Sequence, residues 1–366
     1  MFKLRKLVSL ICVVTLIFSL FVGCTGTKKD SQNSGETKKE QKTDQTETPE
    51  KQEDKPANTV TLKIAHYYAP EHPVNQALLN NFKNKVEKET NGEVKVEVYP
   101  NNQLGNEQEY IEGIQLGTVE MGATGNMWEN TIPQFRLMQM PYMFVNYDHA
   151  DAVLNGPIGE KIFNYLEKLN VKVLASFPNG FRVVSNNKKP INSIEDTKGI
   201  KLRVFEGKTI IAEMKALGFD TVVMPLSEVF TALQQKVVDG QDNPLSTSYY
   251  AGMYEVQKYV AITNHMYSPG YIVINNDIYN KLSDNAQKVL TEAAHETTTA
   301  ILNAVKKQQD DIIKDITGKG VEVTYPDLKP FIEKVEPIVA EYVKEQPEMK
   351  DIVDEINKLG QEYLKK

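Results

Sequence analysis

The sequence has few side chains at the spacings that catalysis or metal binding requires. None of its five histidines belongs to HExxH or a comparable metal-ligand spacing: His66, His72, His149, His265 and His295. GxSxG, GxxxxGK(S/T) and GxGxxG motifs are absent from the sequence. Both cysteines, Cys12 and Cys24, lie near the start, so the rest of the chain has no thiol for a disulfide, a zinc site or nucleophilic catalysis. We therefore expect no enzyme, no cofactor and no metal site.

Arginine and amide side chains are concentrated instead in residues 179–245. This stretch contains NGFRVVSN, then INSIEDTKGIKLRV, and ends with SEVFTALQQKVVDGQDNPL. A guanidinium presents two parallel N–H donors that match both oxygens of a carboxylate, which lysine cannot do. Arg182 and Arg203 could therefore bind a carboxylate. By themselves, arginines on strands are more often surface residues or salt-bridge partners, and Asn243 before Pro244 is also typical of a turn.

Together, these segments resemble the solute-binding proteins of tripartite ATP-independent periplasmic (TRAP) transporters, the dicarboxylate-binding family. The family pattern includes GxR followed by SN, DxKGxKxR, a segment ending in DGxxNP, and YEVQKY. All four occur here in that order, the last at residues 254–259. Residues 103–107 (QLGNE) and 140–144 (MPYMF) are also similar to family segments. The resemblance extends from about Thr59 to the C-terminus.

The resemblance implies roles for particular residues. Arg203 would pair with the ligand carboxylate, Arg182 would support the same group, and Asn243 would bind the carboxylate or a neighbouring hydroxyl. Further ligand-binding candidates come from loops that should face the cleft: His66, Tyr67, Glu107, Asn126, Trp128 and Asn179. Trp128, the only tryptophan, could equally belong to the core.

The strands and helices expected from hydrophobic periodicity alternate along the chain, which is typical of an α/β fold with a mostly parallel sheet. Strands are predicted at 59–65, 93–99, 119–123, 171–177, 181–185, 200–205, 221–224, within 262–275, and at 321–324. Helices are predicted at 74–90, 107–116, 148–169, 209–217, 227–235 and 283–318, with two more in 327–365. The segment 283–318 is much longer than a usual globular helix, and two helices with a break are the alternative.

By resemblance, these elements form a two-lobed periplasmic-binding-protein fold, with the ligand cleft between the lobes and the long helix as a brace. Lobe I would contain residues 59–179 and about 269–308. Lobe II would contain residues 180–268 and about 309–366.

The N-terminal residues are typical of a targeting segment. Residues 1–6 are basic, 7–22 are almost entirely apolar, and Gly23-Cys24 follows, which predicts a signal peptide at 1–23 and lipidation at Cys24. Phe21 departs from the leucine usual in a bacterial lipobox, and an uncleaved anchor is the alternative. Residues 24–58 are polar and nearly free of large apolar side chains, so we expect a disordered tether. The body would then lie at the extracytoplasmic face of the cell membrane.

The expected function is capture of a small organic carboxylate, either a sugar acid or uronate or a dicarboxylate, by an arginine salt bridge and lobe closure. The membrane subunits of a TRAP transporter would be its partners. The net charge of −7 argues against nucleic acid and leaves anion binding to local cations. Two alternatives remain: a ligand-sensing subunit of a membrane receptor, and a secreted enzyme acting on acidic sugars with an acid/base pair from Glu71, Glu107 and Glu129.

Overall fold

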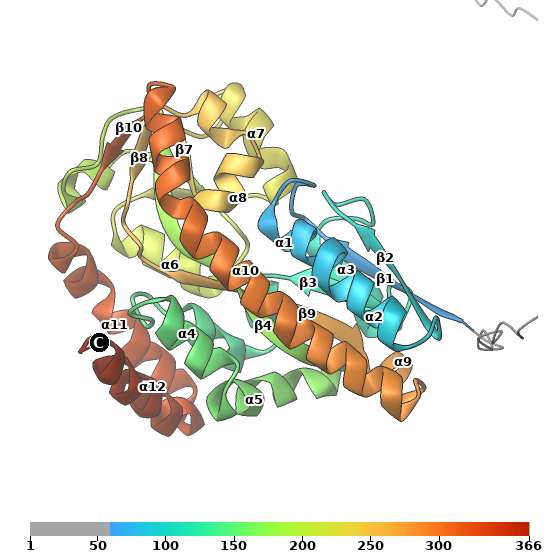
Figure 1. The fold of residues 1–366 in the computed structure, drawn as a ribbon. Coiled ribbons are helices and arrows are strands. Elements are labelled where there is room, and N and C mark those ends of the chain that lie inside the picture. Colours follow the sequence, from blue (N-terminus) through green and yellow to red (C-terminus); the bar gives the residue numbers. More distant parts are fainter. Residues whose placement is uncertain (1–58, 366) are drawn as a thin grey trace, which may run out of the picture. The chain divides into compact units, whose positions relative to one another are not determined.

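The computed structural model describes residues 59–365, in which strands and helices alternate as predicted (Figure 1). The α/β class is therefore confirmed. The predicted signal peptide, the tether and the lipidated Cys24 lie outside the described residues.

One half of the sheet combines parallel strands from the beginning of the chain with two long strands from later in it. In spatial order the strands are β2 (Val94–Tyr99), β1 (Val60–His66), β3 (Met121–Thr124), β9 (Tyr267–Asn275) and β4 (Val171–Asn186). β1 pairs in parallel with β2 and β3, whereas β9 runs antiparallel to both β3 and β4. The prediction of a mostly parallel sheet is thus wrong for the two crossing strands, because they return through the sheet in the opposite direction.

Both faces of this half-sheet are covered, because alternate side chains of each strand enter different cores. In β9, Ile272 and Ile274 pack with the helical segments α1, η1, α2 and α10 (Asp284–Gly318), whereas Tyr271 and Val273 pack with α3, η2, η3, α4 and α5. The bounds of these elements are α1 (Pro73–Ala77), η1 (Leu78–Lys83), α2 (Asn84–Glu89), α3 (Glu107–Leu116), η2 (Asn126–Asn130), η3 (Pro133–Gln139), α4 (Tyr147–Leu154) and α5 (Pro157–Phe163).

The other half of the sheet is built from shorter strands. β5 (Lys201–Val204) pairs in parallel with both β6 (Asp220–Val223) and β7 (Gly240–Pro244), and β7 pairs antiparallel with the second part of β4. β8 (Tyr259–Ala261) joins β4 to β10 (Glu322–Thr324). The helices of this half are α6 (Lys208–Ala216), α7 (Leu226–Gln234) and α8 (Leu245–Tyr250).

β4 and the long helix α10 (Asp284–Gly318) run through both halves, which are the two predicted lobes (Figure 1). The two strands predicted at 171–177 and 181–185 are one strand of 16 residues, with an irregularity between Pro178 and Gly180. α10 is a single helix of 35 residues, so the long-helix prediction is confirmed and the broken alternative is wrong. It buries Ile301 in the first half and Ile316 in the second.

The helix predicted at 148–169 is instead three short pieces, α4, α5 and η4 (Asn164–Leu169). The break occurs at Gly156-Pro157, because proline lacks an N–H and its ring disfavours helical geometry at the residue before it.

The predicted C-terminal helices are α11 (Lys329–Glu345) and α12 (Lys350–Tyr363), joined by the short η7 (Pro347–Met349). Phe331 of α11 packs in the core of β5 and α6, whereas Val353 and Ile356 of α12 pack with α4 and α5. These helices thus contact both halves, and the boundaries of the lobes remain a prediction. The short α9 (Asn276–Asn280) and η6 (Met253–Val256) complete the described elements, with η5 (Ile194–Thr197). Between residues 59 and 365, no helix has both the length and the apolar character that crossing a bilayer requires.

The crossing strands approach each other closely at Gly270, which lies opposite Phe177. A Cβ atom on Gly270 would lie 2.2 Å from the Phe177 ring, and this ring is 1% exposed. We predict that Gly270→Ala lowers the free energy of unfolding by about 1–3 kcal/mol, because the ring is enclosed and cannot move aside. Urea unfolding measures this change.

The matched control is Gly318→Ala at the end of α10, where a Cβ atom meets nothing within 4 Å. This variant should be as stable as the parent or up to about 1 kcal/mol more stable, because alanine favours a helix. Equal stabilities of the two variants would show that the contact between the crossing strands is unimportant.

Candidate functional site

A cavity of about 450 Å³ lies where the carboxyl ends of strands from both halves of the sheet meet. Ligands of open α/β sheets bind at such strand ends, and this volume is within the usual range for small-molecule sites. The first half contributes Tyr67, Asn102, Asn106, Glu107, Gln108, Asn126 and Met127. The other residues that line the cavity are Asn179, Arg182, Arg203, Phe205, Glu206, Val223, Met224, Pro225, Leu226, Ser227, Asn243 and Ser268.

Arg203, the predicted carboxylate ligand, lies near the end of β5 and is 2% exposed. Its Nε donates to the carbonyl oxygen of Met224 at 2.9 Å. Across residues 59–365, no hydrogen bond or ion pair engages its two terminal nitrogens. Burial lowers the pKa of Arg203 to about 10, although Asp242 acts in the opposite direction. The cavity therefore holds a buried cation whose terminal donors have no protein partner.

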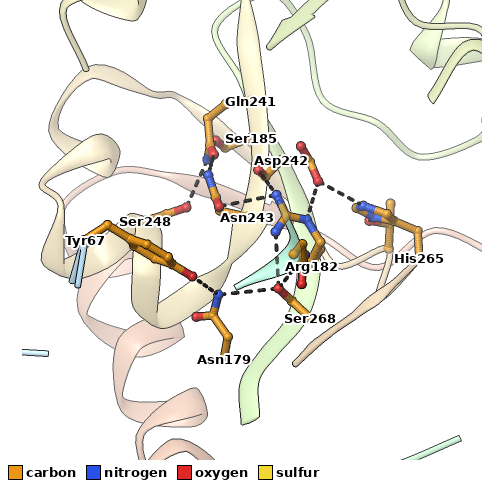
Figure 2. Close-up of polar contacts among 12 residues, drawn as sticks. Tyr67, Asn179, Arg182, Ser185, Gln241, Asp242, Asn243, Ser248, His265 and Ser268 are labelled. Carbon is orange, nitrogen blue, oxygen red and sulfur yellow. Dashed lines mark hydrogen bonds and ion pairs between the residues drawn. The ribbon is translucent and has the colours of Figure 1, made fainter. Parts of the chain in front are cut away.

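Arg182 also lines the cavity, but Asp242 already neutralises it (Figure 2). Its Nε donates to Asp242 Oδ2 at 2.5 Å, and one terminal nitrogen donates to the Asp242 carbonyl oxygen at 2.7 Å. The guanidinium carbon lies 4.9 Å from the centre of the Phe205 ring. Burial raises the pKa of Asp242, but Arg182 and His265 outweigh that effect and hold this pKa well below its usual range. The two arginines are therefore not equivalent.

Amide side chains connect this ion pair to the surrounding strands, as Figure 2 shows. Asn243 accepts from Arg182 at 3.3 Å through Oδ1 and donates from Nδ2 to Gln241 Oε1 at 2.5 Å. Asn179 donates to the hydroxyl of Tyr67 at 3.2 Å and accepts from Thr247. Asn243 and Asn179 are thus held in fixed orientations at the cavity wall.

Glu107 lies at the start of α3, on the first-half side of the cavity. Its Oε1 accepts from the backbone N–H of Gly125 at 2.5 Å. Burial raises the pKa of Glu107 to about 7, even though backbone N–H groups of Gly125 and Met127 favour the ionised form. The side chain can therefore change its charge near neutral pH.

Asn126 begins η2 on the same side and is 6% exposed. Its Nδ2 donates to Ser268 Oγ at 3.0 Å. Its Oδ1 is buried, and nothing within the described range donates a hydrogen bond to it. This acceptor is unsatisfied, which is unusual for a buried polar atom.

His66 and Trp128, which were also predicted to bind the ligand, do not line the cavity. His66 is fully buried, its Nε2 lies 3.1 Å from Asn75 Oδ1, and burial lowers its pKa to about 4. Trp128 is 1% exposed and donates to Thr124 Oγ1 at 2.8 Å. Successive residues of an extended chain point to opposite faces, so Tyr67 reaches the cavity while His66 enters the core.

The carboxylates proposed for an acid/base pair do not meet in the cavity. Glu71 is exposed, and Glu129 accepts hydrogen bonds from the backbone N–H and the hydroxyl of Thr209. Only Glu107 of these three lines the cavity. Within residues 59–365, no group of three or more histidine, cysteine, aspartate or glutamate side chains is arranged to hold a metal ion.

Sequence reasoning missed several residues that line the cavity or pair with its arginines. Met224 to Ser227 directly follow β6. They could have been predicted by treating the residues after every predicted strand as cavity-lining candidates. Asp242 directly precedes Asn243, so its place in the DGQDNP segment was an available signal. Ser268 lies in β9 and has no local signal, because only the pairing of the crossing strands brings it to the site.

The chain is similar to several characterised or solved proteins. A solved TRAP periplasmic solute-binding protein of Haemophilus influenzae, with bound L-gulonate, is 36% identical, with a TM-score of 0.79 over 82% of this chain and 99% of that one. The 2,3-diketo-L-gulonate-binding periplasmic protein YiaO of Escherichia coli is 33% identical over 76% of this chain and 86% of its own length. The C4-dicarboxylate-binding periplasmic protein DctP of Rhodobacter capsulatus is 34% identical over 72% of this chain and 79% of its own length.

A family model described as "Bacterial extracellular solute-binding protein, family 7" matches residues 64–346. The match includes every strand of the described fold except the first residues of β1, and all residues that line the cavity. It confirms the resemblance found in the sequence motifs, and with it the two-lobed fold. The chain belongs to the bacterial extracellular solute-binding proteins of family 7.

Proposed function

We propose that the protein is the extracytoplasmic solute-binding component of a TRAP transporter and that Arg203 captures its ligand by the carboxylate. The observation that supports this role is the buried guanidinium with two unpaired terminal nitrogens in a small-molecule cavity. A carboxylate would accept hydrogen bonds from both nitrogens and supply the counter-charge for the cation that burial has removed from water. Relatives that bind L-gulonate, 2,3-diketo-L-gulonate and C4-dicarboxylates support a sugar acid or a dicarboxylate as the ligand.

Arg182 has a supporting role in this proposal. Because Asp242 and Asn243 occupy most of its donors, it contributes position and local potential more than a second full salt bridge. Its Nη1 donates only a long hydrogen bond of 3.4 Å to Ser268 Oγ, which leaves this edge of the guanidinium the most available to a ligand. Tyr67, Asn179 and Asn243 complete the proposed wall around the carboxylate.

Ligand binding would also favour lobe closure. Glu107 and Asn126 approach the cavity from one half of the sheet, and Arg203 and Met224 approach it from the other. A ligand that contacts both halves binds the closed state better than the open one, and this difference in affinity shifts the equilibrium. Gly180 in β4 has φ of +136°, a conformation suited to glycine, and lies at the irregularity in the pairing of this crossing strand with β9.

The delivery step and the anchor are further parts of the proposal. The ligand-loaded protein would dock on the membrane subunits of a TRAP transporter, and acylation of Cys24 would hold it at the extracytoplasmic face of the membrane. The names of the relatives, which include periplasmic binding proteins, support the extracytoplasmic location.

Radiolabelled palmitate should enter the full-length protein expressed in bacteria and be absent from Cys24→Ser.

We predict that Arg203→Ala weakens L-gulonate binding by about 2–5 kcal/mol, because the carboxylate loses its buried partner. The ligand-free variant should unfold at the same temperature as the parent or at a higher one, since an uncompensated buried cation has been removed. Arg203→Lys should recover only part of the affinity, because lysine lacks the two parallel donors. Isothermal titration calorimetry and thermal unfolding measure both effects.

Lys201→Ala is the matched control, because Lys201 lies on the same strand and its side chain is exposed. It removes one positive charge outside the cavity and should leave L-gulonate affinity unchanged. Arg203→Ala with parental affinity would contradict the proposal.

We also predict that Asp242→Asn destabilises the protein by about 3–5 kcal/mol near neutral pH, because Arg182 then remains buried without a counter-charge. The folded-state pKa of Asp242 is depressed, so its contribution to stability is present above the unfolded value of about 4 and is lost as pH falls towards the folded value. The stability gap between parent and variant should therefore narrow as pH falls below about 4. Glu107 and Glu213, whose pKa values are raised by burial, are common to both proteins.

Urea unfolding at several pH values gives this gap, and the exposed Asp220→Asn provides the control for loss of one carboxylate. A gap that stays constant down to pH 3 would contradict the assigned role of the Arg182–Asp242 pair.

A further inference from the structure

We propose that the cavity selects a polyhydroxylated monocarboxylate over the dicarboxylate of the same carbon skeleton, and that Glu107 determines this selectivity. This inference rests on the proposed function, because it assumes that Arg203 holds one ligand carboxylate. It deepens that function by choosing between the two ligand classes that the relatives leave open.

The charges around the cavity favour a ligand with a single negative charge. Of the two arginines that line it, Arg182 is neutralised by Asp242, which leaves Arg203 as the unpaired cation among the described lining residues. Two carboxylates also line the cavity, Glu107 on the wall and Glu206 in an exposed position. One ligand carboxylate balances Arg203, whereas a second would add negative charge beside Glu107, where low dielectric strengthens repulsion.

Hydrogen-bond donors and acceptors also lie on different sides of the cavity. Arg203 presents donors, whereas on the first-half side Glu107 presents a carboxylate. A carboxylate has about four acceptor positions, and the backbone N–H of Gly125 uses only part of them, so Glu107 can also accept from a ligand hydroxyl. A hydroxyl can donate, whereas an ionised carboxylate can only accept.

The dicarboxylate can also bind if Glu107 takes up a proton, but this proton uptake costs free energy. Because burial raises the pKa of Glu107 to about 7, a proton could remove the repulsion and turn the carboxyl into a donor. A dicarboxylate would then bind together with a proton above this pH, while a hydroxylated monocarboxylate would not need one.

L-gulonate and D-glucarate form the test pair, since they share one six-carbon skeleton and differ only where a terminal CH₂OH is replaced by a carboxylate. Isothermal titration calorimetry of the full-length protein measures its affinity for each of the two ligands. At pH 8 we expect the parent to prefer L-gulonate by at least about tenfold. D-glucarate binding should take up about one proton, measured from the enthalpy in buffers of different ionisation enthalpy.

Glu107→Gln should narrow the preference to about threefold or less by strengthening D-glucarate binding, and should abolish the proton uptake, because the repelling charge is gone. Glu228→Gln is the matched control, since Glu228 is exposed in the first turn of α7 and lies outside the cavity lining. It should leave the preference unchanged.

The outcomes separate the two proposals. Equal affinities of the parent for the two ligands, or an unchanged preference in Glu107→Gln, would overturn the selectivity while Arg203-dependent binding upheld the proposed function. If L-gulonate and D-glucarate both fail to bind the parent at millimolar concentration, or bind Arg203→Ala as tightly as the parent, the carboxylate site itself is overturned.

Discussion

A buried guanidinium without a carboxylate partner is the constraint on which the site depends. Removing a cation from water is costly, and proteins usually offset the cost with a paired anion. Here the Met224 carbonyl oxygen engages one nitrogen of Arg203, and the two others remain available. The stability that a protein carboxylate would have supplied is thus left for the ligand to supply, which makes binding strongly dependent on one ionic group.

The surrounding structure keeps that arginine unpaired. Asp242 is a buried carboxylate that could compete for Arg203, but Arg182 and His265 hold it. Glu129 is held at the start of α6 by Thr209, and Glu107 is held by the backbone of the β3–η2 loop. Asp242, Glu129 and Glu107 therefore all have partners other than Arg203.

Much of this arrangement follows from patterns that sequence alone contains. Alternating strands such as 60–66 and 94–99 and the capped long helix were predictable, because burial on a sheet or along a helix fixes their periodicity. β7 was not predicted, since Gly240 to Pro244 are poor strand formers that are placed by pairing with β4. Arg203 was identified by its motif, but its lack of a partner depends on contacts between distant segments. The direction of the His66 side chain likewise depends on strand register, which a motif does not encode.

A crystal structure of the protein with L-gulonate tests the role of Arg203 most directly. Both carboxylate oxygens should lie about 2.7–2.9 Å from the two terminal nitrogens of Arg203, with Arg182 still paired to Asp242. A ligand bound elsewhere, or in the cavity with its carboxylate away from an unpaired Arg203, would contradict this role.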